Sequence, residues 1–515
     1  MSKVAKATVG LMAVTMMSKV LGFGRELVLG ALYGASMYSD IFIAASNIPK
    51  VLFTIVATAL ATTFIPLYYE NLREGGEDKA LRFSNNILNI TIVLGIILST
   101  ISFIFAEEIV KIFAMGFEGE TFRQAVIFTR IIIFGAIFTG LSDIMKSYLQ
   151  SKNCFVVPGL NGIPYNIILI TAMILSVKIN IYILPVGALL AMASQFFYQV
   201  PFAYKKGYKY KVFIDLKDEN VRRMLILVAP IVIGVAVDQI NIMVDKTLAS
   251  TLAEGSISAL NYADRLKGFV TGMFIASISA VVYPQFSRLS SLEDKTEFKD
   301  FIRKSINSVI IIIMPMTFGA IVLAKPIVRV LFERGAFDER ATAMTASALA
   351  FYAIGLIGVG LRDIMTKMFY SVQDTKTPMI NAGIAVIMNI CMNLIFIRFL
   401  DHRGLALATS LSSIICIILL MISLRRKIGD FGQKNIAIVL VKTFSSSVIM
   451  AVVARLVYDL LKGILGVGFI METISLGCAI AAGAIVYAGF MLILKIDEIS
   501  IITDMVKSKI KKKNN

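Results

Sequence analysis

The feature that most constrains this chain is a series of apolar runs of about 20 residues, the length of helix that crosses the hydrocarbon core of a bilayer. The runs recur along nearly the whole of the 515-residue sequence. Hydrophobic residues make up 57% of the sequence and charged residues only 17%, a composition outside that of ordinary soluble domains. Backbone inside lipid must satisfy its own hydrogen bonds, so such runs fold as helices. The sequence therefore predicts an all-α polytopic membrane protein.

The connections between the runs test this interpretation, because lysine and arginine gather in cytoplasmic loops. Basic residues accumulate in alternate connections and in the C-terminal tail, which predicts an even number of spans with both termini cytoplasmic. Basic loops that face anionic headgroups also explain the net charge of +17 without nucleic acid as a partner. We place about 14 transmembrane helices, near residues 8–32, 41–69, 85–106, 124–149, 157–177, 181–204, 224–249, 258–286, 305–324, 341–370, 379–400, 404–424, 437–461 and 470–494.

The two halves of the sequence resemble each other. The segment "SDIMKSYLQS" at 142–151 is matched by "RDIMTKMFYS" at 362–371, and proline and asparagine residues follow both segments at the same offset. An even number of spans separates the matched elements, so the repeats share one orientation in the membrane. We predict two parallel-related six-helix bundles and two extra C-terminal helices, with bounds 1–215, 216–430 and 431–515.

Charged residues interrupt the first apolar run in the stretch "SKVLGFGREL" at 18–27. Lys19, Gly22, Arg25 and Glu26 fall at steps of three and four, hence on one helical face. An ionisable residue inside a membrane is costly and is a functional candidate by default. Two interpretations are open. The arginine fork suits the oxygens of a phosphate group, or Arg25 and Glu26 form an ion pair that holds helices together.

The eighth run repeats this design in "LNYADRLKGF" at 260–269. Asn261, Asp264, Arg265 and Gly268 share a face rich in small residues, and Asp264 is the expected counter-ion of Arg265. The same two interpretations, an anion contact or a packing ion pair, apply here.

A second polar cluster lacks cations. Asn389 and Asn393 face one way at i and i+4, and Thr409 in the next span is expected to oppose them. With Asp238 they offer the oxygen ligands that a hard monovalent cation needs. The alternative is that the asparagines form hydrogen bonds between helices.

Several kinds of chemistry have no motif in the sequence. There is no nucleotide-binding P-loop and no zinc-protease motif, the four cysteines are scattered, and His402 is the only histidine. The connections are too short for a separate catalytic domain. We expect a transporter rather than an enzyme, although a lipid-modifying membrane enzyme and a scaffold stay open as alternatives from other classes.

Five segments together make the chain resemble a known family: "SKVLGFGREL", "YGASMYSDIF", "TTFIPLY", "LNYADRLKGF" and "VVYPQFSRL". They are similar to the MurJ (MviN) family of lipid II flippases, within the multidrug, oligosaccharidyl-lipid and polysaccharide exporter superfamily. The resemblance implies translocation of lipid II, the undecaprenyl pyrophosphate-linked peptidoglycan precursor, from the inner to the outer leaflet of the bacterial cytoplasmic membrane by alternating access. It implies lipid II, bilayer lipids and the cell-wall synthesis machinery as partners, with a sodium ion as the sole candidate cofactor.

Carried over by position, the resemblance implies substrate contacts at six residues: Lys19, Arg25, Glu26, Asp40, Asp264 and Arg265. It also implies a sodium site at Asp238, Asn389, Asn393 and Thr409, with Asn393 in place of the family's acid. Two positions depart from the family pattern, because Phe53 and Thr58 stand where many members have an arginine and a glutamate. These departures keep open a paralogous flippase of another polyprenyl-linked saccharide, and a multidrug exporter is the further alternative.

Overall fold

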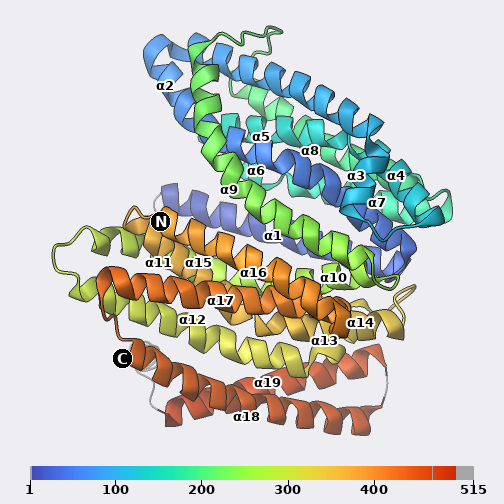
Figure 1. Cartoon of the computed structure of the whole chain (residues 1–515), viewed down its shortest axis with the longest axis vertical. Helices are drawn as coiled ribbons and strands as arrows, with labels where there is room; N and C mark the ends of the chain where they lie inside the picture. The colour runs from blue at the N-terminus through green and yellow to red at the C-terminus, as the bar shows by residue number, and fades with distance from the viewer. Residues whose placement is uncertain (1–2, 467, 495–515) are drawn as a thin grey trace. The chain divides into compact units, whose positions relative to one another are not determined.

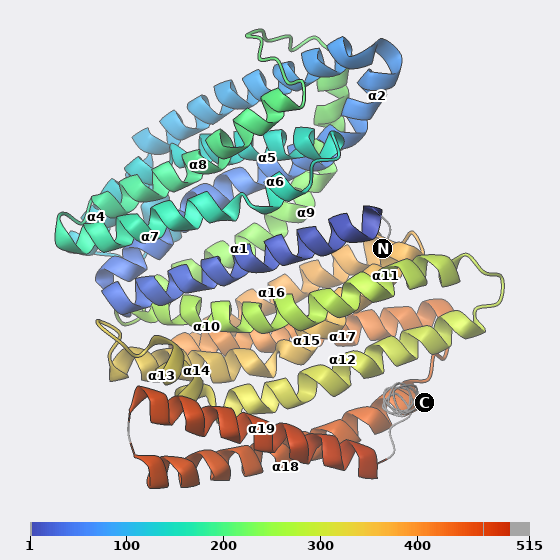
Figure 2. The same cartoon turned by 180° about the vertical axis from the view of Figure 1, so that it is seen from behind.

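The computed structural model describes residues 3–466 and 468–494, with their side chains except those of 3–14, 54–57, 59, 225, 229–231, 233, 234 and 238. The described residues are mostly helical and contain no strand, as predicted (Figures 1 and 2). The elements before the middle of the chain are α1 (Lys3–Tyr33), α2 (Met37–Ile104), α3 (Ala106–Phe113), α4 (Gly119–Ile132), α5 (Gly135–Ser151), α6 (Val156–Gly159), α7 (Gly162–Lys178), α8 (Ile183–Lys205) and α9 (Glu219–Ser250). They are followed by α10 (Ser256–Val270), the π-helical turn η1 (Thr271–Ile275), α11 (Ala276–Ser290), α12 (Thr296–Val322), α13 (Ala324–Phe332), α14 (Glu339–Ile354), α15 (Leu356–Ser371), α16 (Lys376–Leu400), α17 (His402–Ile428), α18 (Gln433–Leu465) and α19 (Phe469–Ile493).

Within the described residues, ten helical segments are long and apolar enough to cross a membrane, or eleven if the bent pair α14 and α15 counts as one span. The backbone of α2 leaves helical geometry at Gly75 and Gly76, where φ reaches 68°, so α2 is two helices joined at a bend. α1 and α9 have spanning length, at 31 and 32 residues, but carry charged side chains. The structure is therefore compatible with about 14 spans.

The chain divides into two compact units, residues 1–258 with 334–337, and residues 259–333 with 338–515. α9 falls in the first unit because it packs against α2. The C-terminal pair α18 and α19 falls in the second unit, where α18 packs against α12. The bounds 1–215, 216–430 and 431–515 stay a prediction about the repeat, and the compact units follow this packing instead.

The backbone carries the internal repeat more clearly than the side chains do. α5 ends at Ser151 and α15 at Ser371, the two matched serines of the repeat. Two residues later the chain takes a left-handed conformation in both places, with φ of 57° at Asn153 and 59° at Gln373. Positive φ is uncommon outside glycine, so its occurrence at matched positions supports an internal duplication.

Each unit has its own aromatic core. In the first, the rings of Tyr68 and Tyr148 meet edge to face with centroids 5.8 Å apart, joining α2 to α5. In the second, Phe286 and Phe298 meet with centroids 6.2 Å apart, joining α11 to α12. Both pairs are fully buried, and such pairs add about 0.5–1.5 kcal/mol beyond the burial of their area. These contacts join neighbouring helices within each unit.

Candidate functional site

The charged stretch of α1 lies against α7. The Arg25 guanidinium is ion-paired with Glu26, donates a hydrogen bond to Oδ1 of Asn166 at 3.3 Å and lies 5.5 Å from the centre of the Tyr165 ring. The side chains of Arg25 and Glu26 are 16% and 4% exposed. Arg25 therefore bridges two helices while part of its surface stays accessible.

Small residues allow this close approach of α1 and α7. A Cβ added at Gly162 would lie 2.1 Å from Oγ of Ser18, and one at Gly22 would lie 3.9 Å from Nδ2 of Asn166. Small residues at a helix contact let the two backbones approach closely, so that polar side chains of both helices can meet. The sequence signalled the polar face of α1 but not its partners, because Tyr165 and Asn166 are distant in the chain and belong to an otherwise apolar run.

The Arg25 cluster has the donors for an anion contact. A guanidinium carries five N–H groups, and the two described hydrogen bonds, to Glu26 and Asn166, use one each on the two terminal nitrogens. Its other N–H groups suit phosphate oxygens without loss of the ion pair. Lys19, one and a half turns earlier on α1, is exposed and adds a second positive charge to the helix.

Asp40 has a different setting from the other predicted substrate contacts. Its carboxylate is buried and accepts the backbone N–H groups of Gly255 and Ser258, both at 2.7 Å, and the Ser258 hydroxyl. These donors belong to the turn before α10 and to its first residues, so Asp40 on α2 caps the N-terminus of α10. The structure thus assigns Asp40 a structural role, and its predicted contact with substrate stays a prediction.

α10 presents Asp264 and Arg265 as exposed residues. Asp264 forms an ion pair with Lys267 at 2.6 Å, and the Lys267 ammonium lies 4.4 Å from the centre of the Tyr352 ring on α14. Sequence reasoning did not single out Lys267, although the i, i+3 spacing was a signal for the pair. The helix widens into η1 directly after α10, and π-helical turns of this kind occur frequently at functional sites.

The predicted cation cluster is brought together in part. Asn393 donates to Oδ1 of Asn389 at 3.0 Å, and Asn389 donates to Oγ of Thr409 and of Ser412, both at 3.5 Å. The side chain of Asp238 lies outside the described residues. These hydrogen bonds join α16 to α17, and the sodium site that the resemblance implies stays a prediction. Among the described residues no group of three or more histidine, cysteine and acidic side chains is placed to hold a metal.

The departure at Phe53 has a packing explanation. Phe53 is buried and lines a small cavity of about 30 Å³ together with Leu60, Thr91 and other largely apolar residues of α2 and α5. A charge at this position would have no counter-ion among those lining residues. Phe53 therefore contributes packing within the first unit, whereas Thr58 is half-buried.

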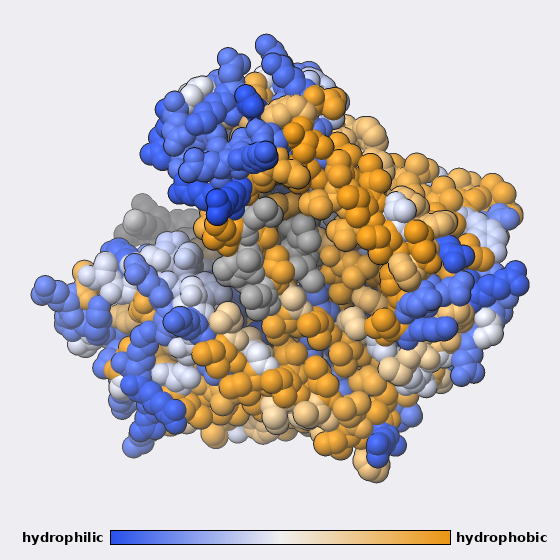
Figure 3. Space-filling model, turned by 45° about the horizontal axis from the view of Figure 1, so that its top comes forward, coloured by the Kyte–Doolittle hydropathy of each residue, from blue (hydrophilic) through white to orange (hydrophobic). Residues whose placement is uncertain are grey.

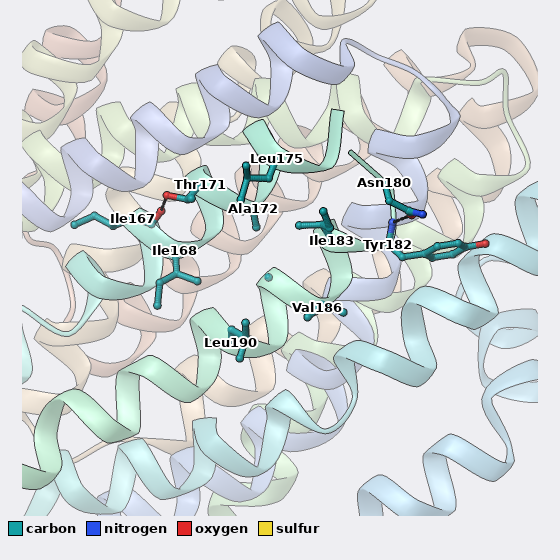
Figure 4. Close-up of a pocket in the computed structure, with 11 residues that line it drawn as sticks. Ile167, Ile168, Thr171, Ala172, Leu175, Asn180, Tyr182, Ile183, Val186 and Leu190 are labelled. Carbon is teal, nitrogen blue, oxygen red and sulfur yellow. Dashed lines mark hydrogen bonds between the residues drawn. The ribbon is translucent and has the colours of Figure 1, made fainter. Parts of the chain in front are cut away.

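A groove of about 450 Å³ runs between α7 and α8 (Figure 4). Its lining is apolar apart from three residues. The Thr171 hydroxyl donates to the carbonyl of Ile167, and Oδ1 of Asn180 accepts the backbone N–H of Tyr182. The groove fits hydrocarbon and has no cation for a phosphate.

Two compact helical units built largely of membrane-length helices, each with a charged cluster on one long helix, define an integral membrane protein with a duplicated helical bundle. An inward-facing multidrug resistance MATE family transporter of the MOP superfamily aligns with 82% of this chain and 99% of its own, at a TM-score of 0.64 and 13% identity, a likeness of fold alone. The family model "Lipid II flippase MurJ" matches residues 29–476. The chain belongs to this family.

Individual relatives agree with that assignment. The lipid II flippase MurJ of Burkholderia cenocepacia is 27% identical, over 80% of this chain and 82% of the relative. The protein named "Probable lipid II flippase MurJ" of Haemophilus influenzae is 28% identical, over 95% of this chain and 99% of the relative. A solved structure of lipid II flippase MurJ in an inward closed conformation covers 94% of this chain and 98% of its own, at a TM-score of 0.79 and 28% identity.

Proposed function

We propose that this protein is a flippase that translocates lipid II from the inner to the outer leaflet of the bacterial cytoplasmic membrane by alternating access. Family membership and the names of its relatives support the substrate. The observation that carries the proposal is Arg25, a partly accessible guanidinium on a helix of membrane-spanning length, held by Glu26 and Asn166 with N–H groups to spare. A pyrophosphate is the part of lipid II that such a group recognises.

Arg25 and Arg265 contact the pyrophosphate in this proposal, and Lys19 adds positive charge. The polyprenyl tail stays in lipid, because moving its hydrocarbon through a polar site would cost free energy with each methylene exposed. The membrane potential or an ion gradient supplies the drive, since one charge moved through 100 mV is worth about 2.3 kcal/mol. The lipid is relocated without chemical change, so the protein is not an enzyme.

The test is flipping of labelled lipid II in vesicles that contain the purified protein, with the outer leaflet read by a membrane-impermeant reagent. Arg25→Gln and Arg265→Gln together are expected to abolish flipping, and Arg25→Lys to reduce it, because lysine keeps the charge but loses the fork. Arg123→Gln is the matched control, since Arg123 is an exposed arginine on α4. Full flipping by the double variant would refute the phosphate contact.

A flippase of another polyprenyl-linked saccharide is the second candidate, because Phe53 packs in an apolar cavity where many family members carry charge. Both lipids are offered in the same vesicles. Flipping of the second lipid with lipid II left in place would select the paralogue.

Three finer features belong to the same proposal. Both termini lie in the cytoplasm, and protease access to tags on the two termini will test this. The protein also contacts the cell-wall synthesis machinery, and crosslinking in cells will test that contact. A sodium ion bound by Asn389, Asn393, Thr409 and Asp238 is the third feature. Sodium-dependent thermal stabilisation that Asn389→Ala removes would support it, and equal stability in sodium and choline would refute it.

A further inference from the structure

The connection between α8 and α9 is held down along α2 by three asparagines. We call residues 208–216 the strap. Asn85, Asn86 and Asn89 are buried on α2 and face it. Their side-chain amides bind backbone groups of strap residues 209, 211, 213 and 215. Asn85 donates to the carbonyl of 209 and accepts the N–H of 211, and Asn89 donates to the carbonyls of 211 and 213. Asn86 donates to the carbonyl of 215 and accepts its N–H.

Every one of these distances lies between 2.8 and 3.1 Å. Two tyrosine hydroxyls add to the attachment, because Tyr208 donates to Asn85 at 2.9 Å and Tyr210 to Asn89 at 2.8 Å. The odd-numbered residues thus turn their backbone groups toward α2. This attachment supplies an irregular segment with the hydrogen bonds that backbone needs next to a membrane.

From residue 212 on, the even-numbered residues of the strap present apolar side chains outward. Val212 is 81% exposed and Leu216 69% exposed, with Ile214 between them also exposed. Single exposed apolar side chains are ordinary on a soluble surface. A row of them on a segment fixed by eight hydrogen bonds indicates a surface that something apolar covers.

The location of the strap points to the lipid bilayer as the covering partner. The face of α2 that carries Asn85 and Asn89 continues one and two turns later as Val93 and Ile96, which are exposed within an apolar candidate span. The strap therefore covers this face of α2 up to the point where its side chains become apolar and exposed. Figure 3 shows hydrophilic side chains gathered at the upper end of the view, directly beside a broad hydrophobic flank.

The charge of the segment matches anionic headgroups. Exposed lysines stand at positions 206, 209, 211 and 217, next to the apolar row. The one acid of the strap, Asp215, lies 3.8 Å from Arg82 of α2. Apolar side chains that enter the interface beside lysines that meet phosphate groups are the pattern of an interfacial membrane anchor.

We propose that the strap is an anchor in the membrane interface, which inserts Val212 and Leu216 among the acyl chains and binds anionic phospholipid headgroups through Lys209 and Lys211. The anchor holds the bend of α2 at a set depth in the leaflet. It is independent of the transported substrate.

The chain contains no tryptophan, so Val212→Trp places a single fluorophore in the strap. The variant protein is reconstituted into vesicles of phosphatidylcholine brominated on its acyl chains, with and without phosphatidylglycerol. Glu293→Trp, at an exposed position in the connection of α11 and α12, is the matched control. We expect bromolipid to quench the Val212→Trp emission about two-fold more than the control emission. Acrylamide, which stays in water, should quench the control emission more.

The lysines are tested in the same protein. Lys209→Gln with Lys211→Gln in the Val212→Trp background is expected to remove the extra quenching that phosphatidylglycerol brings, as is high salt. Because these lysines are exposed, their substitution is expected to leave the fold intact. The helical content of the variant, compared with that of the Val212→Trp protein, checks this. If Val212→Trp is as open to acrylamide as Glu293→Trp in anionic vesicles, the lipid anchor is refuted and a protein partner is left as the occupant. Quenching that is indifferent to phosphatidylglycerol would refute the headgroup contact.

Discussion

The ion pair of Arg25 and Glu26 makes a prediction that separates folding from transport. Glu26 is 4% exposed, and removal of one partner of a buried ion pair costs about 3–5 kcal/mol, because the other charge stays buried. Arg25→Ala also loses the bond to Asn166 and the contact with Tyr165. We expect Arg25→Ala to lower the free energy of unfolding by about 3–5 kcal/mol, and Arg25→Lys by about 1 kcal/mol, the value of one hydrogen bond.

The informative variant is Arg25→Ala combined with Glu26→Gln. Neutralising Glu26 removes the stranded carboxylate, so the double variant should recover about 2 kcal/mol or more of the loss. It should still fail to flip lipid II, because the guanidinium is absent. Stability is measured by denaturant titration in mixed micelles, and flipping in vesicles as above. Parental stability of Arg25→Ala would refute the energetic reasoning, and parental flipping by the double variant would refute the role of Arg25.

Three further outcomes are expected from the structure. Asp40→Ala leaves three donors at the start of α10 without their acceptor and should cost about 1–3 kcal/mol of unfolding free energy, whereas Asp40→Asn, which keeps an acceptor oxygen, should cost less in the same titration. Gly34→Ala should lower the melting temperature of the purified protein, because φ is 60° and the new Cβ would lie 2.3 Å from the carbonyl oxygen of Ala336; an unchanged melting temperature contradicts this. The hydrogen bond from Lys427 lowers the pKa of Asp374 from 3.8 to about 2. The difference in unfolding free energy between the parent and Asp374→Asn should therefore be constant above the unfolded-state pKa of Asp374 and should close as the pH falls through its folded-state pKa. A difference that widens in acid would contradict this.

The spans and the polar face of α1 could be predicted from the sequence because both depend on local periodicity. Apolar length gives a span, and steps of three and four give a face. The contacts of Arg25 on α7 could not be predicted in this way, since Asn166 lies 141 residues away and one asparagine in an apolar run carries no pairing information.

Asp40 shows a second limit. Its identity suggested a substrate contact by resemblance, yet its neighbours come from a turn more than 200 residues later. A carboxylate that caps a helix and a carboxylate that awaits a ligand look alike in sequence, and the donors around them distinguish the two. The strap was missed for a related reason, because its lysines indicate only one of the basic connections and the asparagines that hold it lie on a distant helix.

The matched turns at Asn153 and Gln373 give this molecule a built-in comparison. Both copies have kept the left-handed backbone conformation at this position, although the residue that adopts it differs between them. Asparagine tolerates left-handed geometry better than glutamine, so the second copy carries more torsional strain for the same path. Glycine in place of Gln373 would thus relieve more strain than glycine in place of Asn153. The turn at Asn153 provides the comparison within the same molecule.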